Sequence, residues 1–455
     1  MFGTSGVRGR VGTEITADLA LDIGRALASD GAETVVIGRD ARESGRTLAR
    51  ALSAGITECG GDVLDVGVQP TPTVARSVVR ADADAGVVVT ASHNPAPDNG
   101  IKLWAADGQA FDTDENARIV DIVRSEAFDF AAWDAVGTHR SQSDARAEHE
   151  RALQEAVDIP EDLRVIVDLG NGVGRVTADA LHAAGCHVET LNGQRDGRFP
   201  GRPSEPKAAN CETACALVGA TDADLGLVHD GDADRLMAID ERGRFVSGDA
   251  LLALFARRAV EKSDGTGASG ESTPASPRVA VPVDTSLLVA DALSEVGGTV
   301  TYTPVGDAYV AAETAQPAVA FGGEPSGSWI WPEPPRCPDG PLAACTLAAI
   351  VAAAGSLAEL VDALPSYPIR RDSVRTEAKR AVLEQVAETA REQFTDVSTL
   401  DGIRVETDAG WFLVRASGTE PLVRITAEAR EEADAEMLFD TARSLVMAAI
   451  DDHSG

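Results

Sequence analysis

The sequence is poor in lysine and in long apolar runs, and each shortage excludes a class of protein. Only four lysines accompany its arginines, and the net charge of the 455 residues is −33. Nucleic acids and anionic membranes need a basic surface, so we expect neither as a partner. No apolar run approaches membrane-spanning length, and the chain does not start with a basic, apolar signal segment. These absences predict a soluble, cytoplasmic protein.

Closely spaced pairs of cysteines are also scarce. The six cysteines are scattered, and only Cys211 and Cys215 lie four residues apart. A zinc site of the common kind needs a second close pair, which the chain lacks. We therefore expect unpaired cysteines in a reducing compartment.

Acidic residues are spread along the whole chain and are not gathered in a tail. An apolar content of 44% still allows a sizeable core. A solvated acidic surface repels itself at low salt, as in halophilic proteins. We expect the stability of this protein to rise with molar salt.

Short apolar strands alternate with helical patterns over most of the chain, which predicts parallel sheets. The composition turns polar near residues 138–150, and the alternating pattern then restarts twice. A long amphipathic helix, three strands and a last helix end the chain, as in a small α+β domain. We predict an α/β fold of three similar domains with mixed, mostly parallel sheets, followed by a C-terminal α+β domain. The predicted limits are 1–140, 141–243, 244–362 and 363–455.

The segment Thr90–Pro95 breaks abruptly from a short apolar strand at residues 86–89. Ser92 therefore lies on a loop at the carboxyl end of a strand, where ligands bind in open α/β sheets. Serine, asparagine and proline are also ordinary turn residues. Taken alone, the loop allows either a nucleophile or a plain turn.

Asp230, Asp232 and Asp234 alternate directly after another predicted strand. Three carboxylates this close repel one another unless a cation neutralises them, and oxygen ligands favour Mg²⁺ beside a phosphate. A solvated acidic loop and a phosphatase that uses Asp230 as nucleophile are alternatives. In a calcium loop Glu241 would fall at the twelfth position, but Arg235 occupies the sixth, where glycine is required.

Three further loops combine glycine with arginine or hydroxyl groups. They are the glycine-rich start with Arg8, residues 322–327 with Glu324 and Ser326, and residues 415–421. Arginine and hydroxyl groups suit phosphate, although ordinary turns contain the same residues.

Taken together, these loops resemble those of the α-D-phosphohexomutase superfamily along essentially the whole chain. The similar segments are, in order, Phe2–Gly9, Thr90–Pro95, Asp196–Pro206, Asp230–Arg235, Gly323–Gly327 and Arg415–Pro421. The resemblance implies four domains around a central cleft. It also implies an isomerase that interconverts hexose 6-phosphate and hexose 1-phosphate, with small sugar phosphates as partners and a monomer or homodimer as the assembly.

The resemblance implies that a phosphorylated Ser92 donates its phosphoryl group and that a bisphosphorylated sugar is the intermediate and activator. One Mg²⁺ per chain would be bound by Ser92, Asp230, Asp232 and Asp234. Lys102 and Arg8 are the candidate general bases, and His93 would orient the phosphate. The implied substrate-binding residues are Arg235, Asp307, Glu324, Ser326, Arg415, Ser417, Gly418, Thr419 and Arg424.

The identity of the sugar depends on two loops. Val305-Gly306-Asp307 resembles the corresponding segment of phosphoglucosamine mutases. Ala308 stands where arginine is common, and Ser328 stands where histidine is common. We expect glucosamine 6-phosphate and glucosamine 1-phosphate as substrates, with phosphomannomutase/phosphoglucomutase activity as the alternative. An aspartyl-nucleophile phosphatase and a catalytically silent sugar-phosphate-binding protein are the remaining alternatives.

Overall fold

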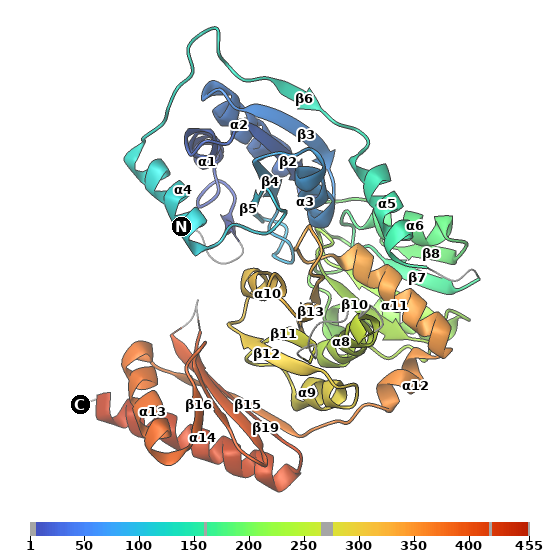
Figure 1. Ribbon diagram of the computed structural model, residues 1–455, viewed down its shortest axis with the longest axis vertical. Coiled ribbons are helices and arrows are strands. Elements are labelled where there is room, and N and C mark those ends of the chain that lie inside the picture. Colours follow the sequence, from blue (N-terminus) through green and yellow to red (C-terminus); the bar gives the residue numbers. More distant parts are fainter. Residues whose placement is uncertain (1–5, 159–161, 265–275, 418–420, 454–455) are drawn as a thin grey trace, which may run out of the picture.

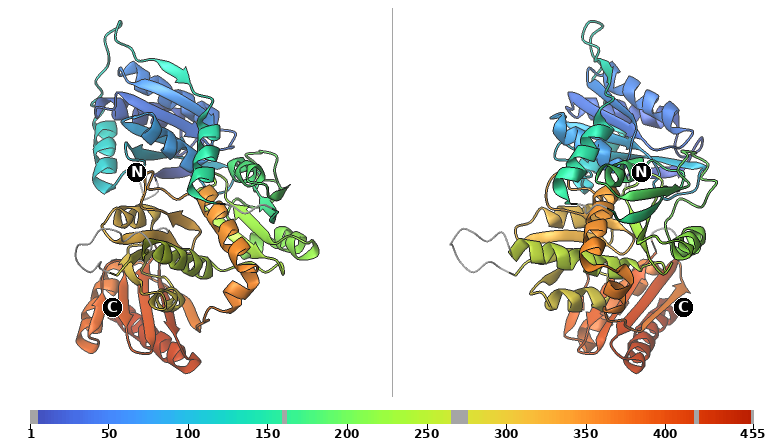
Figure 2. Two further views of the ribbon diagram at one scale, coloured as in Figure 1. Left: turned by 45° about the vertical axis from the view of Figure 1, so that its right-hand side comes forward. Right: turned by 90° about the vertical axis from the view of Figure 1, so that its right-hand side faces the viewer.

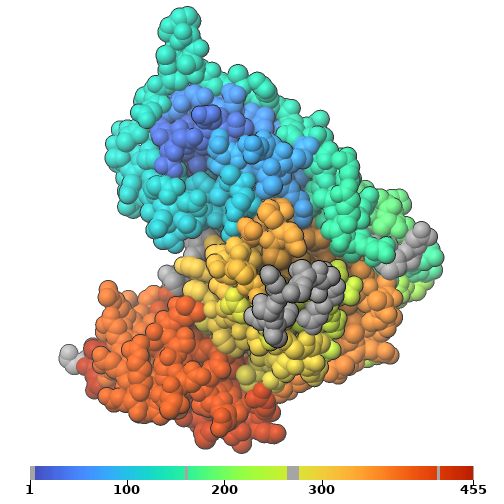
Figure 3. Space-filling view, viewed as in Figure 1, coloured from blue at the N-terminus to red at the C-terminus, as the bar shows by residue number. Residues whose placement is uncertain are grey.

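The computed structural model describes residues 6–158, 162–264, 276–417 and 421–453. In this part of the chain four sheets follow one another in sequence order, and we call each sheet with its helices a unit. The first and fourth units lie at opposite ends of the molecule, with the second and third between them (Figures 1 and 2). The space-filling view shows an indentation of the surface between the first and fourth units (Figure 3).

The first unit contains a six-stranded mixed sheet. In spatial order its strands are β1 (Val7–Arg10), β5 (Asp98–Ala105), β4 (Ala85–Val89), β2 (Thr34–Arg39), β3 (Asp62–Val68) and β6 (His139–Ser141). Its helices are α1 (Ala17–Ser29), α2 (Gly45–Glu58), α3 (Thr71–Arg80) and α4 (Thr113–Ser125). All five residues of β4 are buried, which explains its unbroken apolar run. The hydroxyl of Thr16 caps α1 by accepting a hydrogen bond from the backbone of Leu19.

The second unit contains a four-stranded sheet. Its strands in spatial order are β10 (Leu236–Asp240), β9 (Leu225–His229), β7 (Arg164–Asp168) and β8 (His187–Leu191). Its helices are α5 (Ala145–Ala156), α6 (Arg175–Ala183), the short η1 (Ala208–Asn210) and α7 (Glu212–Ala220). Strands β7, β8 and β9 are parallel, whereas β9 and β10 form an antiparallel hairpin. The acidic segment 230–235 is the turn of this hairpin.

The third unit has the same kind of sheet, with three parallel strands and one antiparallel edge strand. In spatial order they are β12 (Thr299–Thr303), β11 (Arg278–Pro282), β13 (Val319–Glu324) and β14 (Ser328–Ile330). The helices are α8 (Gly248–Asp264), α9 (Leu287–Ser294), α10 (Asp307–Thr314), α11 (Gly340–Ala354) and α12 (Leu357–Asp362). The loop 325–327 connects β13 to β14, so its side chains lie at the carboxyl end of β13.

The fourth unit is a five-stranded antiparallel sheet, so the prediction of three strands was wrong. Its strands are β15 (Ile369–Arg375), β19 (Leu422–Ala429), β18 (Gly410–Ala416), β17 (Ile403–Glu406) and β16 (Asp396–Ser398). Helices α13 (Lys379–Gln393) and α14 (Glu432–His453) pack on one face of this sheet. Trp411 and Leu413 on the opposite face pack against Val283 of the third unit.

The second and third units share one continuous hydrophobic core. Helix α11 follows the third sheet in sequence but contacts α5, α6 and strands β9 and β10 of the second unit. The predicted fold class is confirmed: the first three sheets are mixed and mostly parallel, and the fourth belongs to an α+β unit. Strand β6, residues 139–141, spans the predicted limit of the first domain.

Two expectations about composition can be compared with the structure. The six cysteines are all free thiols. None of the helices in the described ranges has the length and apolar character needed to cross a membrane.

Candidate active site

Ser92 lies in a strained conformation on the loop that follows β4. Its φ angle is +47°, in the left-handed region that non-glycine residues rarely adopt, and its exposed fraction is 1%. The backbone N–H of Ser92 donates to the hydroxyl of Thr90 at 2.8 Å, and that hydroxyl donates to Asp40 at 2.7 Å. The Ser92 hydroxyl donates to Asp230 Oδ2 at 2.6 Å. The first unit thus presents the serine directly to the acidic turn of the second unit.

Arg42 fixes the path of the serine loop. Its guanidinium donates five hydrogen bonds, one to Asp40 and four to backbone carbonyls of the loop. The carbonyls belong to Ser92, Asn94, Pro95 and Asp98, at distances of 2.7–2.9 Å. The side chain is 1% exposed, and the ring of Phe199 from the second unit lies 5.0 Å from its guanidinium carbon. A single arginine therefore fixes the backbone of the serine loop.

Residues of the second unit connect the serine loop to the acidic turn. The hydroxyl of Ser204 donates to the Ser92 carbonyl at 2.9 Å and accepts from the backbone of Gly231 at 2.9 Å. Arg202 anchors this segment through Asp168 at 2.7 Å and the carbonyl of His229 at 2.5 Å. These groups are buried, so the two loops are held at a fixed separation.

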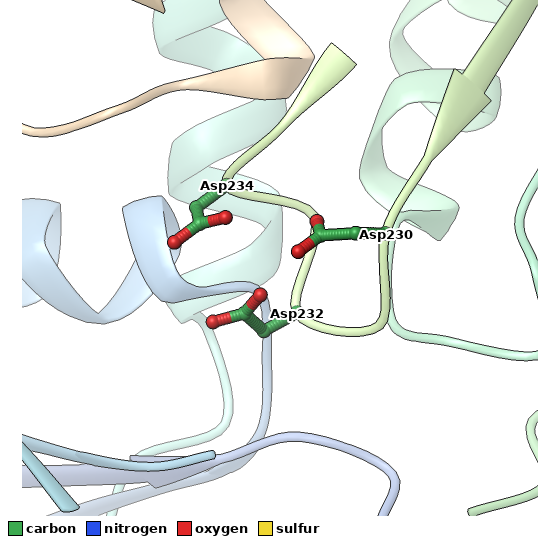
Figure 4. Close-up of side chains that lie close together, drawn as sticks. All are labelled: Asp230, Asp232 and Asp234. Carbon is green, nitrogen blue, oxygen red and sulfur yellow. The ribbon is translucent and has the colours of Figure 1, made fainter. Parts of the chain in front are cut away.

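Asp230, Asp232 and Asp234 point toward one another from the β9–β10 turn (Figure 4). One carboxylate oxygen of each lies within 4.8 Å of the others, and all three residues are buried. Thr71, the first residue of α3, donates its hydroxyl to Asp232 at 2.6 Å. The remaining oxygens Asp232 Oδ1 and Asp234 Oδ1 are buried and have no hydrogen-bond partner among the described residues.

This donor set fits a divalent cation. Burial and the carboxylates of Asp234 and Asp232 raise the pKa of Asp230 well above its ordinary value, which a cation would reverse. Carboxylate oxygens are the ligands that Mg²⁺ prefers, and buried oxygens without partners are available to bind it. The calcium-loop alternative does not fit, because Glu241 accepts hydrogen bonds from Ser356 and from the backbone of Ala358 at the start of α12.

Lys102 on β5 reaches the other side of the acidic turn. Its Nζ lies 2.8 Å from Asp234 and 3.7 Å from Asp307 of the third unit. Burial alone lowers the pKa of Lys102, but these carboxylates outweigh it and the pKa is raised. Lys102 is therefore a charged hydrogen-bond donor in this geometry. Arg8 on β1 also borders the site, and its buried Nε lacks a partner within the described segments.

His93 follows the serine, and its Nδ1 lies 3.3 Å from the Ser92 hydroxyl. Burial and then the nearby Arg235 and Arg8 lower the pKa of His93 to about 3. The imidazole is therefore neutral at physiological pH and able to exchange hydrogen bonds with a group on Ser92.

A cavity of about 380 Å³ joins these residues to the third and fourth units. Glu324 lines it from the end of β13, accepting from the backbone of Gly306 at 2.8 Å and from Ser326 at 3.3 Å. Burial and the carboxylate of Asp307 raise the pKa of Glu324 to about 7. The cavity is lined by Arg8, Ser92, Lys102, Asp234, Arg235, Asp249, Asp284, Asp307, Glu324, Ser326, Ser328 and Arg371, among others.

The predicted phosphate-binding residues of the fourth unit lie apart from this lining. Arg415 binds Asp401 at 2.8 Å and Asp284 at 3.7 Å, and it stands opposite Arg424 in the β18–β19 register. Ser417 is 3% exposed, and its carbonyl accepts a hydrogen bond from Lys379. Gly418 and Thr419 lie outside the described residues.

The structure therefore brings together Ser92, His93, Lys102 and the acidic turn, and gathers Arg235, Asp307, Glu324 and Ser326 around one cavity. Sequence reasoning missed some residues that hold these loops in place and others that line the same cavity. They are Asp40, Arg42, Thr71, Arg202, Ser204, Asp249, Asp284 and Arg371. One sequence signal was available: Asp40 and Arg42 follow the carboxyl end of β2, where ligand loops occur.

Four family descriptions match the chain in order. They are phosphoglucomutase/phosphomannomutase α/β/α domain I at residues 1–130, domain II at 147–243, domain III at 247–367 and the C-terminal domain at 373–444. The chain therefore belongs to the phosphoglucomutase/phosphomannomutase family, the α-D-phosphohexomutases.

Two archaeal relatives cover nearly the whole chain, and both are described as probable phosphoglucosamine mutases. That of Methanopyrus kandleri is 43% identical over 457 residues, covering 99% of this chain and 98% of its own. That of Methanothermobacter thermautotrophicus is 44% identical over 452 residues, covering 97% of each chain. A crystal structure of a phosphoglucomutase/phosphomannomutase family protein from Burkholderia thailandensis has a TM-score of 0.87 at 28% identity. It covers 99% of this chain and 98% of its own.

Proposed function

We propose that this protein interconverts glucosamine 6-phosphate and glucosamine 1-phosphate through a phosphoserine at Ser92. The observation that carries the proposal is the 2.6 Å hydrogen bond from the Ser92 hydroxyl to Asp230, within a buried triad of carboxylates. A phosphoryl group on Ser92 would lie against the same carboxylates, an arrangement that needs a cation between them. Membership of the hexomutase family agrees with this chemistry.

The reaction consists of two phosphoryl transfers. In the first, the bond between phosphorus and Ser92 Oγ breaks, a bond to a sugar hydroxyl oxygen forms, and the hydroxyl proton passes to a base. The bisphosphorylated sugar then turns in the cavity, and its other phosphoryl group returns to Ser92. One Mg²⁺, held by Asp230, Asp232, Asp234 and the serine phosphate, would neutralise charge on the transferring group.

The chain's own residues have distinct parts in these steps. Lys102 and Arg235 donate to the transferring phosphoryl oxygens, and neutral His93 orients them. Lys102 and Arg8 are the two candidates for the base, and the raised pKa of Lys102 argues against its acting as a base in this geometry. Glu324 and Ser326 bind sugar hydroxyls, and Arg415, Ser417, Gly418, Thr419 and Arg424 bind the phosphate that does not react.

The acidic lining of the cavity favours an amino sugar. Five carboxylates border it, those of Asp234, Asp249, Asp284, Asp307 and Glu324. At neutral pH the 2-amino group of glucosamine carries a proton, so these carboxylates attract it, whereas glucose and mannose present only hydroxyl groups there. The descriptions of the two archaeal relatives agree with this choice. Phosphomannomutase/phosphoglucomutase activity is the second candidate, because the matching family descriptions name those enzymes.

A substrate panel tests the proposal. Values of kcat/KM are measured for the 6-phosphates of glucosamine, glucose, mannose and N-acetylglucosamine, with Mg²⁺ and a hexose 1,6-bisphosphate activator. We expect glucosamine 6-phosphate to be preferred. Ser92→Ala should abolish turnover, whereas Ser141→Ala, at an exposed serine of β6, should not. Phosphate recovered on Asp230 in place of Ser92 would instead establish the phosphatase alternative.

A further inference from the structure

Arg371 is the cation that the fourth unit contributes to the lining of the cavity. It lies on β15 in a part of the chain where sequence reasoning predicted no site. Its side chain is exposed, and within the described ranges it has no hydrogen-bond or ion-pair partner. An unpaired arginine facing a cavity that also contains Arg8, Lys102 and Arg235 is suited to bind an anion.

Arg415, unlike Arg371, has ion-pair partners. Two of its guanidinium nitrogens are bound to carboxylates, one to Asp401 at 2.8 Å and one to Asp284 at 3.7 Å. It does not border the cavity, whereas Arg371 does. At Arg415 a phosphate would compete with these carboxylates for two nitrogens and would find only the buried Nε without a partner among the described residues, whereas Arg371 has no carboxylate at ion-pair distance there.

The sheet places the two arginines on the same face. Arg371 stands opposite Thr426, which stands opposite Leu413, and Leu413 packs against Val283 of the third unit. Residues directly opposite one another in an antiparallel sheet share a face. Arg415 is two residues beyond Leu413 on β18, so it also points toward the third unit. Arg371 thus extends the predicted phosphate site toward the cavity.

We propose that Arg371 is a second phosphate contact of the fourth unit, one that retains the bisphosphorylated sugar while it turns between the two transfers. This inference rests on the proposed function. During turning both phosphates leave their first positions, so an additional cation in the lining of the cavity opposes escape. Asp249 and Asp284 border the same cavity, and the charge of Arg371 opposes the rise in pKa that burial causes in both carboxyls.

The test measures escape of the intermediate. Enzyme carrying labelled phosphate on Ser92 is mixed with glucosamine 6-phosphate, and labelled bisphosphate released to solution is compared with labelled product. In Arg371→Gln we expect the ratio of released bisphosphate to product to rise about tenfold to a hundredfold, because the variant loses a charge-assisted contact with phosphate. The concentration of glucose 1,6-bisphosphate needed for half-maximal steady-state activity should rise in parallel. Arg371→Lys, which keeps the charge, should recover part of the effect.

Arg370→Gln is the matched control, since Arg370 is the neighbouring residue on the opposite face and pairs with Glu432 of α14. If Arg371→Gln and Arg370→Gln have the same release ratio and the same activator requirement, the inference is overturned. A fall in turnover with an unchanged release ratio would also overturn it. Failure of the proposed function is distinguishable, because in that case the unaltered protein would transfer no label to glucosamine 6-phosphate.

Discussion

Replacing Arg42 by methionine should destabilise the protein and slow the reaction together. Methionine fills a similar volume but removes all five hydrogen bonds of the guanidinium. Two of the four carbonyls keep another donor: Ser92 O keeps the hydroxyl of Ser204, and Pro95 O keeps the backbone of Asp98. The main loss is the buried ion pair with Asp40, in which both side chains have no exposed surface.

Removing one partner of a buried ion pair costs about 3–5 kcal/mol. Asp40 limits this cost because burial already raises its pKa to about 6, and without Arg42 it would take up a proton more readily. A carboxyl whose pKa is higher in the folded than in the unfolded state destabilises the fold as the pH rises through the folded value. The difference between Arg42→Met and the unaltered protein should therefore be larger at pH 8 than at pH 5.

The assay is urea unfolding at both pH values, with kcat and KM measured in parallel. We expect a loss of about 3–5 kcal/mol at pH 8 and a fall in kcat of about a hundredfold, since small displacements of a reacting group are costly. Arg46→Met, at an exposed position of α2, is the matched control. If Arg42→Met unfolded like Arg46→Met, or kept the kcat of the unaltered protein, the role assigned to Arg42 would be refuted.

Three further predictions concern other parts of the molecule. The pKa of Glu324 is raised to about 7, so kcat/KM should increase with pH through that value as the carboxylate forms. Glu324→Gln should lack this pH-dependent rise, and a rise that persists in the variant would contradict its assignment to Glu324. Asp232→Asn should raise the Mg²⁺ concentration needed for half-maximal activity about tenfold or more. Asp121→Asn, at an exposed position of α4, should leave it unchanged, and an equal Mg²⁺ requirement in the two variants would argue against the metal site. The melting temperature should rise between dilute buffer and molar KCl, and a constant value would disprove the halophilic interpretation.

Many strands of the fold could be predicted because they are short apolar runs bounded by turns, whereas β15 and β16 were missed because their sequences are polar and largely exposed. Strand β4 is the clearest case, with five buried residues. Helix α5 could not be predicted in the same way. Its sequence is strongly charged, and only Ala145, His149 and Leu153, four residues apart, are buried. Such a narrow apolar stripe is hard to distinguish from a polar linker.

Helix α11 escaped prediction for a different reason. It is apolar nearly all round, with eight buried residues, because it packs against strands and helices of the second unit as well as its own. An apolar segment buried on several sides has no helical periodicity to detect. Its place depends on contacts with residues more than a hundred positions away, such as those of β9 and β10.

The candidate site could be predicted where one loop carries several polar groups, as at Ser92 or Asp230–Asp234. Arg42 follows the end of β2 and Ser204 lies within Asp196–Pro206, but their contacts could not be predicted, because both bind the backbone carbonyl of Ser92, which is distant in sequence. Any residue type can supply a carbonyl, so the partner leaves no trace in the sequence. Ordinary residues that position a site are therefore visible only in the fold.

The distribution of contacts suits the two demands of a mutase. The phosphoryl donor must stay fixed: Arg42 holds the serine loop within the first unit, and the buried bonds of Ser204 and Thr71 join the first two units around it. The sugar must turn, and the cavity is lined by residues of all four units, among them Arg8, Arg235, Glu324 and Arg371. The third and fourth units meet through the apolar cluster of Trp411, Leu413 and Val283 and through buried Glu428, which accepts from Ser286 and Leu287. Buried Arg404 also joins them by donating to the carbonyl of Val283. Release of the intermediate should then depend on cations such as Arg371, and transfer on the fixed pair of loops.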